Sequence, residues 1–282
     1  MKVGLFVDIT EDYAEKIRHA KRLGFDCGQL AMWDMDFYTE ENLLGLKRVL
    51  REEQFEVHGF WCGWSEPVIW KYPEMYRSLG LVPEAYREKR LEELRRGARF
   101  AHALGVDTVI THTGYLPDDP HDHTHVAIVE GLRELCLELR SRGQRFAFET
   151  GEELPLTLSL MIGEIGLDNV GVNFDPANLI TTGRGNPRDA MELLVSRVFG
   201  MHAKDGVPAR FGEVKGKQVR VGEGRADFRR LLTQLKSGGY TGDIYIEHEI
   251  PNCDTRDRDI LDARQYLMGL IDEIYGEKGE KV

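Results

Sequence analysis

Four acidic or imidazole side chains stand at the ends of four consecutive β-type segments in the second half of the chain. These residues are Glu149, Asp175, His202 and Glu247. Neighbouring parallel strands present their carboxyl ends on one face, so we expect the four side chains to converge there. Three converging carboxylates would repel each other while losing water, and a divalent cation removes that conflict. The pattern therefore predicts a metal site at this face.

The predicted ligand set combines oxygen atoms with a single imidazole. Such a set suits Mn²⁺, Mg²⁺ or Co²⁺, and Zn²⁺ also accepts it. We expect one divalent ion, with Mn²⁺ favoured. Any one of these residues alone has an ordinary alternative, since a carboxylate at a strand end is commonly solvated or paired with Lys or Arg. The repetition at the same depth on four strands is what favours a metal site.

Other side chains near the same strand ends are candidates for contacts with a substrate. His112 lies at the depth of the ligands, and the alternative is a structural histidine. Lys204 shares the inward phase of His202, so it either binds substrate oxygens or pairs with a carboxylate. Trp61, with Trp64, would offer an apolar wall to a substrate, and buried packing is the alternative.

Three remaining features are better explained by structure than by chemistry. His58 lies deeper in its strand and is expected to be a core histidine. The group His121, His123 and His125 lies in a loop among aspartates, which indicates a solvated helix entry rather than a second metal site. The run Gly222-Glu223-Gly224 is compatible with phosphate binding, but a turn before a helix capped near Asp227 explains it equally well.

The elements that must position these residues alternate along the whole chain. Strands are predicted at 2–8, 25–32, 55–61, 106–112, 145–149, 170–175, 198–204 and 243–248. Helices are predicted at 12–23, 40–53, 86–104, 125–142, 154–165, 187–195, 227–236 and 256–275. In the third helix, Leu91, Leu94, Ala98 and Ala101 share one face. Glycines at 24, 105 and 143 follow helices, where they terminate them.

Eight strands alternating with eight helices predict an α/β fold, a single-domain (β/α)₈ TIM barrel over residues 1–275. An open doubly wound sheet is disfavoured, because no glycine-rich loop follows the first strand. The long connections 62–85 and 205–226 both follow strands, so they belong to the face that carries active sites. Residues 276–282 are expected to form a charged tail.

Composition excludes several classes of function. The 282 residues carry a formal net charge of −11, which argues against nucleic acid as a partner. Four scattered cysteines without a C-x-x-C pair indicate neither a disulfide framework nor a thiolate zinc site. The sequence predicts no signal peptide and no membrane span, so we expect a cytoplasmic protein without a membrane partner. The oligomeric state stays open, with a homo-oligomer among the alternatives.

At several of these strand ends the sequence resembles the xylose isomerase-like TIM barrels, or sugar phosphate isomerase/epimerases. The resemblance rests on Phe148-Glu149, Asn173-Phe174-Asp175-Pro176-Ala177-Asn178, His202-Ala203-Lys204-Asp205, Gly222-Glu223-Gly224 and Ile246-Glu247. It implies that the Glu, Asp, His and Glu bind the metal and that Glu149 and Glu247 also act as the acid/base pair. Ketose 3-epimerases of this family often have His where this chain has Asn178. An asparagine can still hydrogen-bond a hydroxyl or a metal-bound water, but it cannot shuttle a proton.

The function that follows is a metal-dependent isomerase or epimerase of a small sugar, working by glutamate-mediated proton transfer through a metal-stabilised enediolate. The first alternative is a metal-dependent dehydratase of a keto-sugar or inosose. A non-catalytic sugar-binding barrel is disfavoured because both glutamates are present. An abasic-site endonuclease is disfavoured because the resemblance would require a histidine at position 178 and an Asp-x-His before Gly222.

Overall fold

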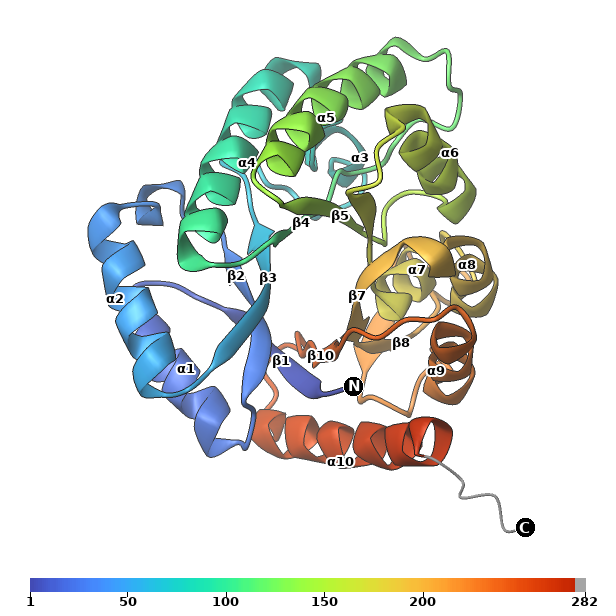
Figure 1. Cartoon of the computed structure of the whole chain (residues 1–282). Coiled ribbons are helices and arrows are strands. Elements are labelled where there is room, and N and C mark those ends of the chain that lie inside the picture. The colour runs from blue at the N-terminus through green and yellow to red at the C-terminus, as the bar shows by residue number, and fades with distance from the viewer. Residues whose placement is uncertain (277–282) are drawn as a thin grey trace.

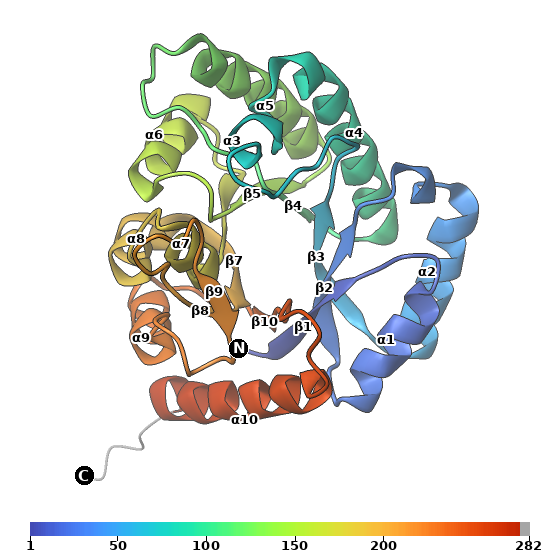
Figure 2. The same cartoon turned by 180° about the vertical axis from the view of Figure 1, so that it is seen from behind.

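The computed structural model describes residues 1–276 and shows a closed parallel barrel surrounded by helices (Figure 1). The strand order around the barrel is β1-β10-β7-β6-β5-β4-β3-β2. Seen from behind, the helices again form the outer ring, and α7 lies nearer the barrel axis than α8 (Figure 2). The predicted single-domain TIM barrel is therefore confirmed.

The eight barrel strands match the eight predicted ones within a few residues. They are β1 (Val3–Asp8), β2 (Cys27–Met32), β3 (Glu56–Cys62), β4 (Thr108–Thr111), β5 (Arg145–Glu149), β6 (Val170–Phe174), β7 (Val198–Ala203) and β10 (Ile244–Ile246). The predicted helices are also present, as α1 (Tyr13–Arg22), α2 (Glu40–Glu52), α4 (Glu84–Leu104), α5 (His123–Ser141), α6 (Pro155–Ile165), α8 (Pro187–Leu194), α9 (Phe228–Ser237) and α10 (Arg256–Tyr275).

Several short elements lie in segments where the sequence predicted only connections. The connection after β3 contains α3 (Met75–Ser78), and the connection after β7 forms an antiparallel hairpin of β8 (Asp205–Val207) and β9 (Lys217–Val219). A further helix, α7 (Pro176–Thr182), follows β6 directly. Two short 3₁₀ helices, η1 (Met35–Phe37) and η2 (Val195–Arg197), complete the described elements.

Local signals explain where the helices begin and end. Thr39 caps α2 by accepting the backbone N–H of Asn42, and Asp122 caps α5 in the same way. At the other end, α4 stops at Gly105, whose φ of +93° is favourable only for glycine. The inward face of α4 is the predicted one, since Leu91, Leu94, Ala98 and Ala101 are all buried.

Two irregularities of the barrel lie close to the predicted site. The β2–β3 register shifts at Gly28/Gln29, and the β6–β7 register shifts at Val172/Asn173. Such bulges re-aim the side chains next to them. Here both shifts adjoin Gln29 and Asn173, two buried polar residues that contact each other inside the barrel.

Within residues 1–276, no helix is both long and apolar enough to cross a membrane. The predicted charged tail, apart from Gly276, lies outside the described residues.

Candidate active site

The four predicted ligands meet at the carboxyl ends of β5, β6, β7 and β10. Glu149 ends β5 and His202 lies near the end of β7, while Asp175 and Glu247 each follow their strand by one residue. His202 Nδ1 lies 3.2 Å from Glu149 Oε1, 3.5 Å from Asp175 Oδ2 and 2.8 Å from Glu247 Oε2. One potential ligand atom of each residue falls within 4.8 Å of all the others.

The chemistry of this cluster fits a divalent cation. All four side chains are at most 5% exposed, so their charges have little water around them. Asp175 Oδ2 and Glu247 Oε2 are buried and have no hydrogen-bond donor aligned with them. Unsatisfied buried carboxylate oxygens are costly, and a cation is the ordinary way to satisfy several at once. The group could therefore hold a metal ion, with three carboxylates and one imidazole as donors.

A buried amide pair fixes the orientation of the His202 ring. His202 Nε2 lies 2.8 Å from Gln29 Oε1, and Gln29 Nε2 donates at 2.8 Å to Asn173 Oδ1. Because the Gln29 amide nitrogen is used by Asn173, its oxygen faces the histidine and accepts the Nε2 proton. Nδ1 is then the nitrogen directed at the carboxylates. Gly200 leaves room for this pair, since a Cβ there would lie 2.3 Å from Asn173 Oδ1.

Glu149 is held by two neighbours on its two oxygens. The Trp61 indole N–H donates to Oε2, and the Asn178 amide donates at 3.1 Å to Oε1. The structure thus places both predicted substrate contacts on Glu149, while Trp61 also lines the cavity above it. Asp175 is fixed differently: it caps α7, and its Oδ1 accepts the Asn178 backbone N–H at 2.8 Å.

Lys204 contacts the other predicted base. Its ammonium lies 3.0 Å from Glu247 Oε1 and 3.8 Å from Asp175 Oδ2, and it also pairs with Glu249. Burial raises the pKa of Glu247, but Lys204 and His202 outweigh that effect and leave the pKa below its ordinary value. The lowered pKa keeps Glu247 ionised at neutral pH, which its predicted role as a base requires.

His112 also reaches the site, with an acidic partner that the sequence reasoning did not identify. His112 Nδ1 lies 2.9 Å from Glu152 Oε2, and Nε2 lies 3.6 Å from Glu149 Oε1. Burial lowers the pKa of His112, but Glu152 and Glu149 dominate and raise it to about 10. Glu153 follows Glu152 in the chain and is also buried. Burial and the charge of Glu152 raise its pKa to about 8.

The missed residues carry weak signals in the sequence. Gln29 is the polar residue of the fully buried strand β2, and a glutamine within such a strand is itself unusual. Glu152 follows Glu149 by three residues in the loop after β5, and this proximity to a predicted ligand is its only signal.

The other histidines do not contribute to this site. His58 lies toward the opposite end of the barrel, where its hydrogen bond to Asp243 raises its pKa to about 10. At the entry of α5, His123 is exposed as expected, but the expectation of a fully solvated group is wrong for His125. That residue is 2% exposed, because its ring packs between Pro117 O and Glu164.

The glycine run after β9 is a turn whose amides are already used. The backbone N–H groups of Gly222 and Gly224 each donate at 3.0 Å to Asp205 Oδ2, and Ala226 N donates to Oδ1. Asp227 then caps α9. The structure thus shows these amides bound to an internal carboxylate rather than turned toward a phosphate.

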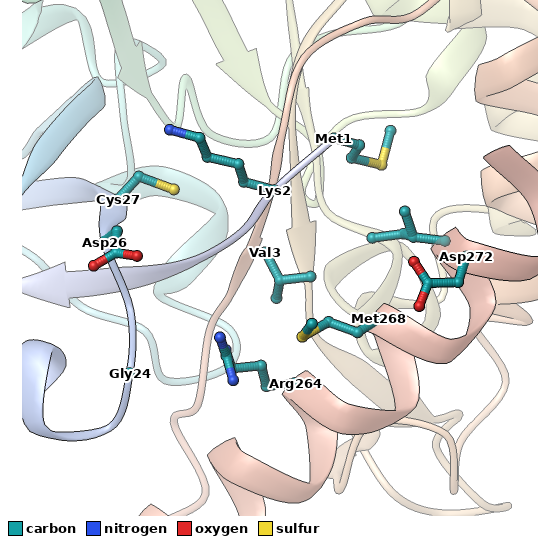
Figure 3. Close-up of a pocket in the computed structure, with 10 residues that line it drawn as sticks. Met1, Lys2, Val3, Gly24, Asp26, Cys27, Arg264, Met268 and Asp272 are labelled. Carbon is teal, nitrogen blue, oxygen red and sulfur yellow. The ribbon is translucent and has the colours of Figure 1, made fainter. Parts of the chain in front are cut away.

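A cavity of about 570 Å³ opens directly above the four residues, and Glu149, Glu247, His112, Lys204 and Trp61 line it. A separate, smaller cavity of about 220 Å³ lies at the amino-terminal end of the barrel, with Lys2, Cys27 and Arg264 around it (Figure 3). The chemistry-bearing cluster thus belongs to the larger cavity.

A closed (β/α)₈ barrel with buried polar residues at the carboxyl ends of its strands defines a TIM-barrel enzyme architecture. A family model for the xylose isomerase-like TIM barrel matches residues 17–269, and the chain belongs to that family.

Individual relatives agree with this assignment. The L-ribulose-5-phosphate 3-epimerase UlaE of Salmonella typhimurium is 26% identical over 280 residues, covering 93% of each chain. A xylose isomerase domain protein from Planctomyces limnophilus is 27% identical, with a TM-score of 0.91 over 98% of this chain and 99% of the other. A xylose isomerase-like TIM barrel protein from Mycobacterium smegmatis was solved in complex with magnesium. It is 19% identical, with a TM-score of 0.72 over 93% of this chain and 89% of the other. The chain is an enzyme of the sugar isomerase and epimerase type.

Proposed function

We propose that this protein is a divalent-metal-dependent isomerase or epimerase of a small sugar, with Glu149 and Glu247 as its proton carriers. The observation that carries the proposal is the buried meeting of Glu149, Asp175, His202 and Glu247 below a cavity of about 570 Å³. A magnesium ion in a structural neighbour and the epimerase activity in the name of UlaE support it.

In this proposal the ion is held by Glu149, Asp175, His202 and Glu247. When bound, it supplies Lewis acidity toward the oxygens of an open-chain sugar. Mn²⁺ is the ion we favour, with Mg²⁺, Co²⁺ and Zn²⁺ as the alternatives that the donor set allows.

The side chains of this chain divide the remaining work. Glu149 and Glu247 come from β5 and β10, on either side of Asp175 and His202, so a sugar between them is flanked on two faces. One glutamate takes the proton from a carbon next to the carbonyl, and an enediolate forms. The other returns a proton on the opposite face in an epimerase, whereas one glutamate serves both steps in an isomerase.

The surrounding contacts hold these two bases in place. Trp61 and Asn178 fix the Glu149 carboxylate, and Lys204 keeps Glu247 ionised. His112, braced by Glu152, is directed toward Glu149 and is suited to hydrogen-bond a sugar hydroxyl.

Hydrogen exchange with solvent tests this function. The protein, first stripped and then loaded with Mn²⁺, is incubated in D₂O with a panel of ketoses, aldoses and inososes. We expect metal-dependent deuterium incorporation at a carbon next to the carbonyl of at least one sugar, with an epimer or isomer as product. Binding of a sugar without any exchange would instead indicate a non-catalytic barrel.

One observation favours a second candidate, the dehydration of a keto-sugar or inosose. Lys204 lines the cavity 3.0 Å from Glu247, so an acid able to protonate a leaving hydroxyl stands beside a base. In the same D₂O experiment a dehydratase would release a product one water lighter than its substrate, which mass spectrometry distinguishes from an epimer.

A further inference from the structure

A second cavity of similar size adjoins the cavity above the proposed metal ligands. This adjoining cavity measures about 530 Å³, and Trp33 and Trp70 line both it and the catalytic cavity. The catalytic cavity alone falls in the size range of ordinary small-molecule sites, roughly 300–1,000 Å³. The second cavity thus adds room for a second unit of about the same size as the first.

We propose that the adjoining cavity is a glycosyl subsite and that the substrate is a glycosylated sugar, with its reacting unit at the metal ligands. This proposal rests on the proposed function, because it names the substrate class of that same site. The occupant of the second cavity is a neutral sugar ring joined to the reacting unit.

The aromatic lining is the first argument. The chain has four tryptophans, and all of them line one or both cavities: Trp33, Trp61, Trp64 and Trp70. The centroid of the Trp33 ring lies 4.8 Å from that of Trp61 and 5.2 Å from that of Trp64. These contacts form one aromatic wall that spans the catalytic cavity and the adjoining one. Flat apolar faces with a polar edge suit the C–H face of a sugar ring.

The charge of the cavity lining is the second argument, because it favours a neutral sugar ring over a phosphate as the occupant. The charged residues that line the adjoining cavity are Asp34 and Glu66, both carboxylates. Each uses one oxygen for a backbone N–H, of Asp36 and Val68 respectively, which leaves the other for a sugar hydroxyl. A phosphate dianion placed here would meet like charge on both sides.

Two nearby groups that could have bound a phosphate donate hydrogen bonds within the protein instead. Arg90 packs 5.5 Å from the Trp64 ring centroid, but it donates to the backbone carbonyls of Ser78, Gly80 and Pro67. The amides of Gly222 and Gly224 are bound to Asp205. Lys215 is an exposed cation on the catalytic cavity, so the test includes a phosphorylated ligand.

Binding to three forms of one ketose tests the proposal. The probes are D-fructose, its 6-O-glucosyl derivative isomaltulose, and D-fructose 6-phosphate, titrated into the Mn²⁺-loaded protein by calorimetry and by tryptophan fluorescence. Lactulose, turanose and trehalulose extend the panel to other linkages. We expect at least one glycosylated ketose to bind about tenfold or more tighter than both fructose and its phosphate. Its binding should change the tryptophan emission strongly, because every tryptophan lines one or both of the cavities.

Variants on one loop provide the matched control. In Trp70→Ala, the ratio of glycoside affinity to fructose affinity should fall toward one, and Trp70→Phe should restore part of it. Tyr72→Ala removes another exposed aromatic of the same loop that lines neither cavity, and it should keep the parent ratio.

The outcomes separate the two proposals. Equal affinity for fructose and every glycosylated ketose, no binding of any glycosylated ketose, or tighter binding of the phosphate ester overturns the glycosyl subsite. Tight glycoside binding with no deuterium exchange on any sugar overturns the proposed function but supports the subsite. An unchanged ratio in Trp70→Ala also contradicts the subsite.

Discussion

At the residue scale, the central feature is that two of the proposed metal ligands are also the proposed proton carriers. Glu149 and Glu247 would both hold the ion and move protons, whereas Asp175 and His202 would mainly hold the ion. A carboxamide keeps an oxygen for the metal but cannot act as a base. The two functions can therefore be separated by substitution.

We predict that Glu149→Gln and Glu247→Gln each reduce turnover more than they reduce metal content. Loss of a placed base typically removes about 10²–10⁴-fold in rate. His202→Ala should instead lose metal, and excess Mn²⁺ should partly rescue it. The measurement is metal content beside D₂O exchange for each variant. If both Gln variants keep their metal and exchange protons at the parent rate, another residue carries the proton, with Lys204 the first to examine.

Gln29 allows a second prediction, because it would act on a bound metal ion only through His202. Gln29→Leu removes the acceptor at His202 Nε2 and the donor to Asn173, so the ring loses the contact that selects its tautomer. Loss of such an outer contact typically weakens metal binding about 10–100-fold. We expect that loss in a Mn²⁺ titration followed by electron paramagnetic resonance.

A matched variant separates this effect from general instability. Gln144 is equally buried, at 1% exposed, and donates to two backbone carbonyls away from the site. Gln144→Leu should lower stability while leaving Mn²⁺ affinity unchanged. Equal affinity losses in both variants would contradict a positioning role for Gln29.

The sequence was most informative about this site where a residue type repeats at one depth, and it also indicated His112, Trp61, Asn178 and Lys204. Glu149, Asp175, His202 and Glu247 could be predicted to converge because strand ends align in a barrel. Gln29 has only the weak signal of a polar residue in an apolar strand, because its contact with His202 depends on a bulge and on the room beside Gly200, which appear only in the folded barrel. The contact of Glu152 with His112 depends on the path of the loop after β5.

At the element scale, the eight strands and eight main helices could be predicted because short apolar runs alternate with longer segments of helical period along the chain. The hairpin β8–β9 and the helix α7 could not. β8 and β9 have three residues each and no apolar alternation of their own, and they are held by the buried carboxylate of Asp205 on the glycine turn. α7 starts at Pro176, directly after Asp175, a proposed metal ligand that also caps the helix.

The connection after β3, which carries Trp64 and Trp70, depends on one arginine of α4. Arg90 is 1% exposed and donates to three backbone carbonyls of this connection. A lysine keeps the charge but cannot reach all three acceptors from one ammonium. We predict that Arg90→Lys lowers the free energy of unfolding by about 3 kcal/mol and makes residues 63–82 sensitive to protease, since hydrogen bonds from charged groups are the strong ones.

An exposed arginine of the same helix serves as the control. Arg99 pairs with Glu92 at the surface, so Arg99→Lys should change the free energy of unfolding by less than about 1 kcal/mol. Parent-like protease resistance in Arg90→Lys would show that the connection is held by its other contacts.

At the scale of the whole molecule, net charge limits the partners. A charge of −11 on 282 residues repels polyphosphate unless a basic face is built, and the proposed site is lined by carboxylates. We predict that the Mn²⁺-loaded protein neither retains an abasic DNA duplex in a gel-shift assay at low salt nor nicks it. Nicking that disappears in His202→Ala would contradict this prediction and favour the endonuclease alternative.

Stability of the whole barrel should also depend on pH through Glu153. Burial raises the pKa of this carboxyl from 4.5 to about 8 in the folded chain, so the folded state keeps a proton that the unfolded state releases. Between about pH 4.5 and pH 8 the unfolded state binds fewer protons, and the free energy of unfolding therefore falls as pH rises, then levels off.

We predict that Glu153→Gln removes this dependence. The variant and the parent should be about equally stable near pH 4.5. At pH 9 the variant should be more stable by at most about 5 kcal/mol, because one unit of pKa difference corresponds to about 1.4 kcal/mol. Denaturant unfolding of both proteins from pH 4.5 to pH 9 at a fixed Mn²⁺ concentration gives the difference between their free energies of unfolding. Metal binding depends on pH in the same way in both proteins, so its contribution cancels in this difference. Glu192→Gln, at an exposed position on α8, is the control. Its free energy of unfolding should differ from that of the parent by an amount that does not vary with pH. A parallel pH profile for Glu153→Gln and the parent would mean that Glu153 is already ionised in the folded barrel at neutral pH.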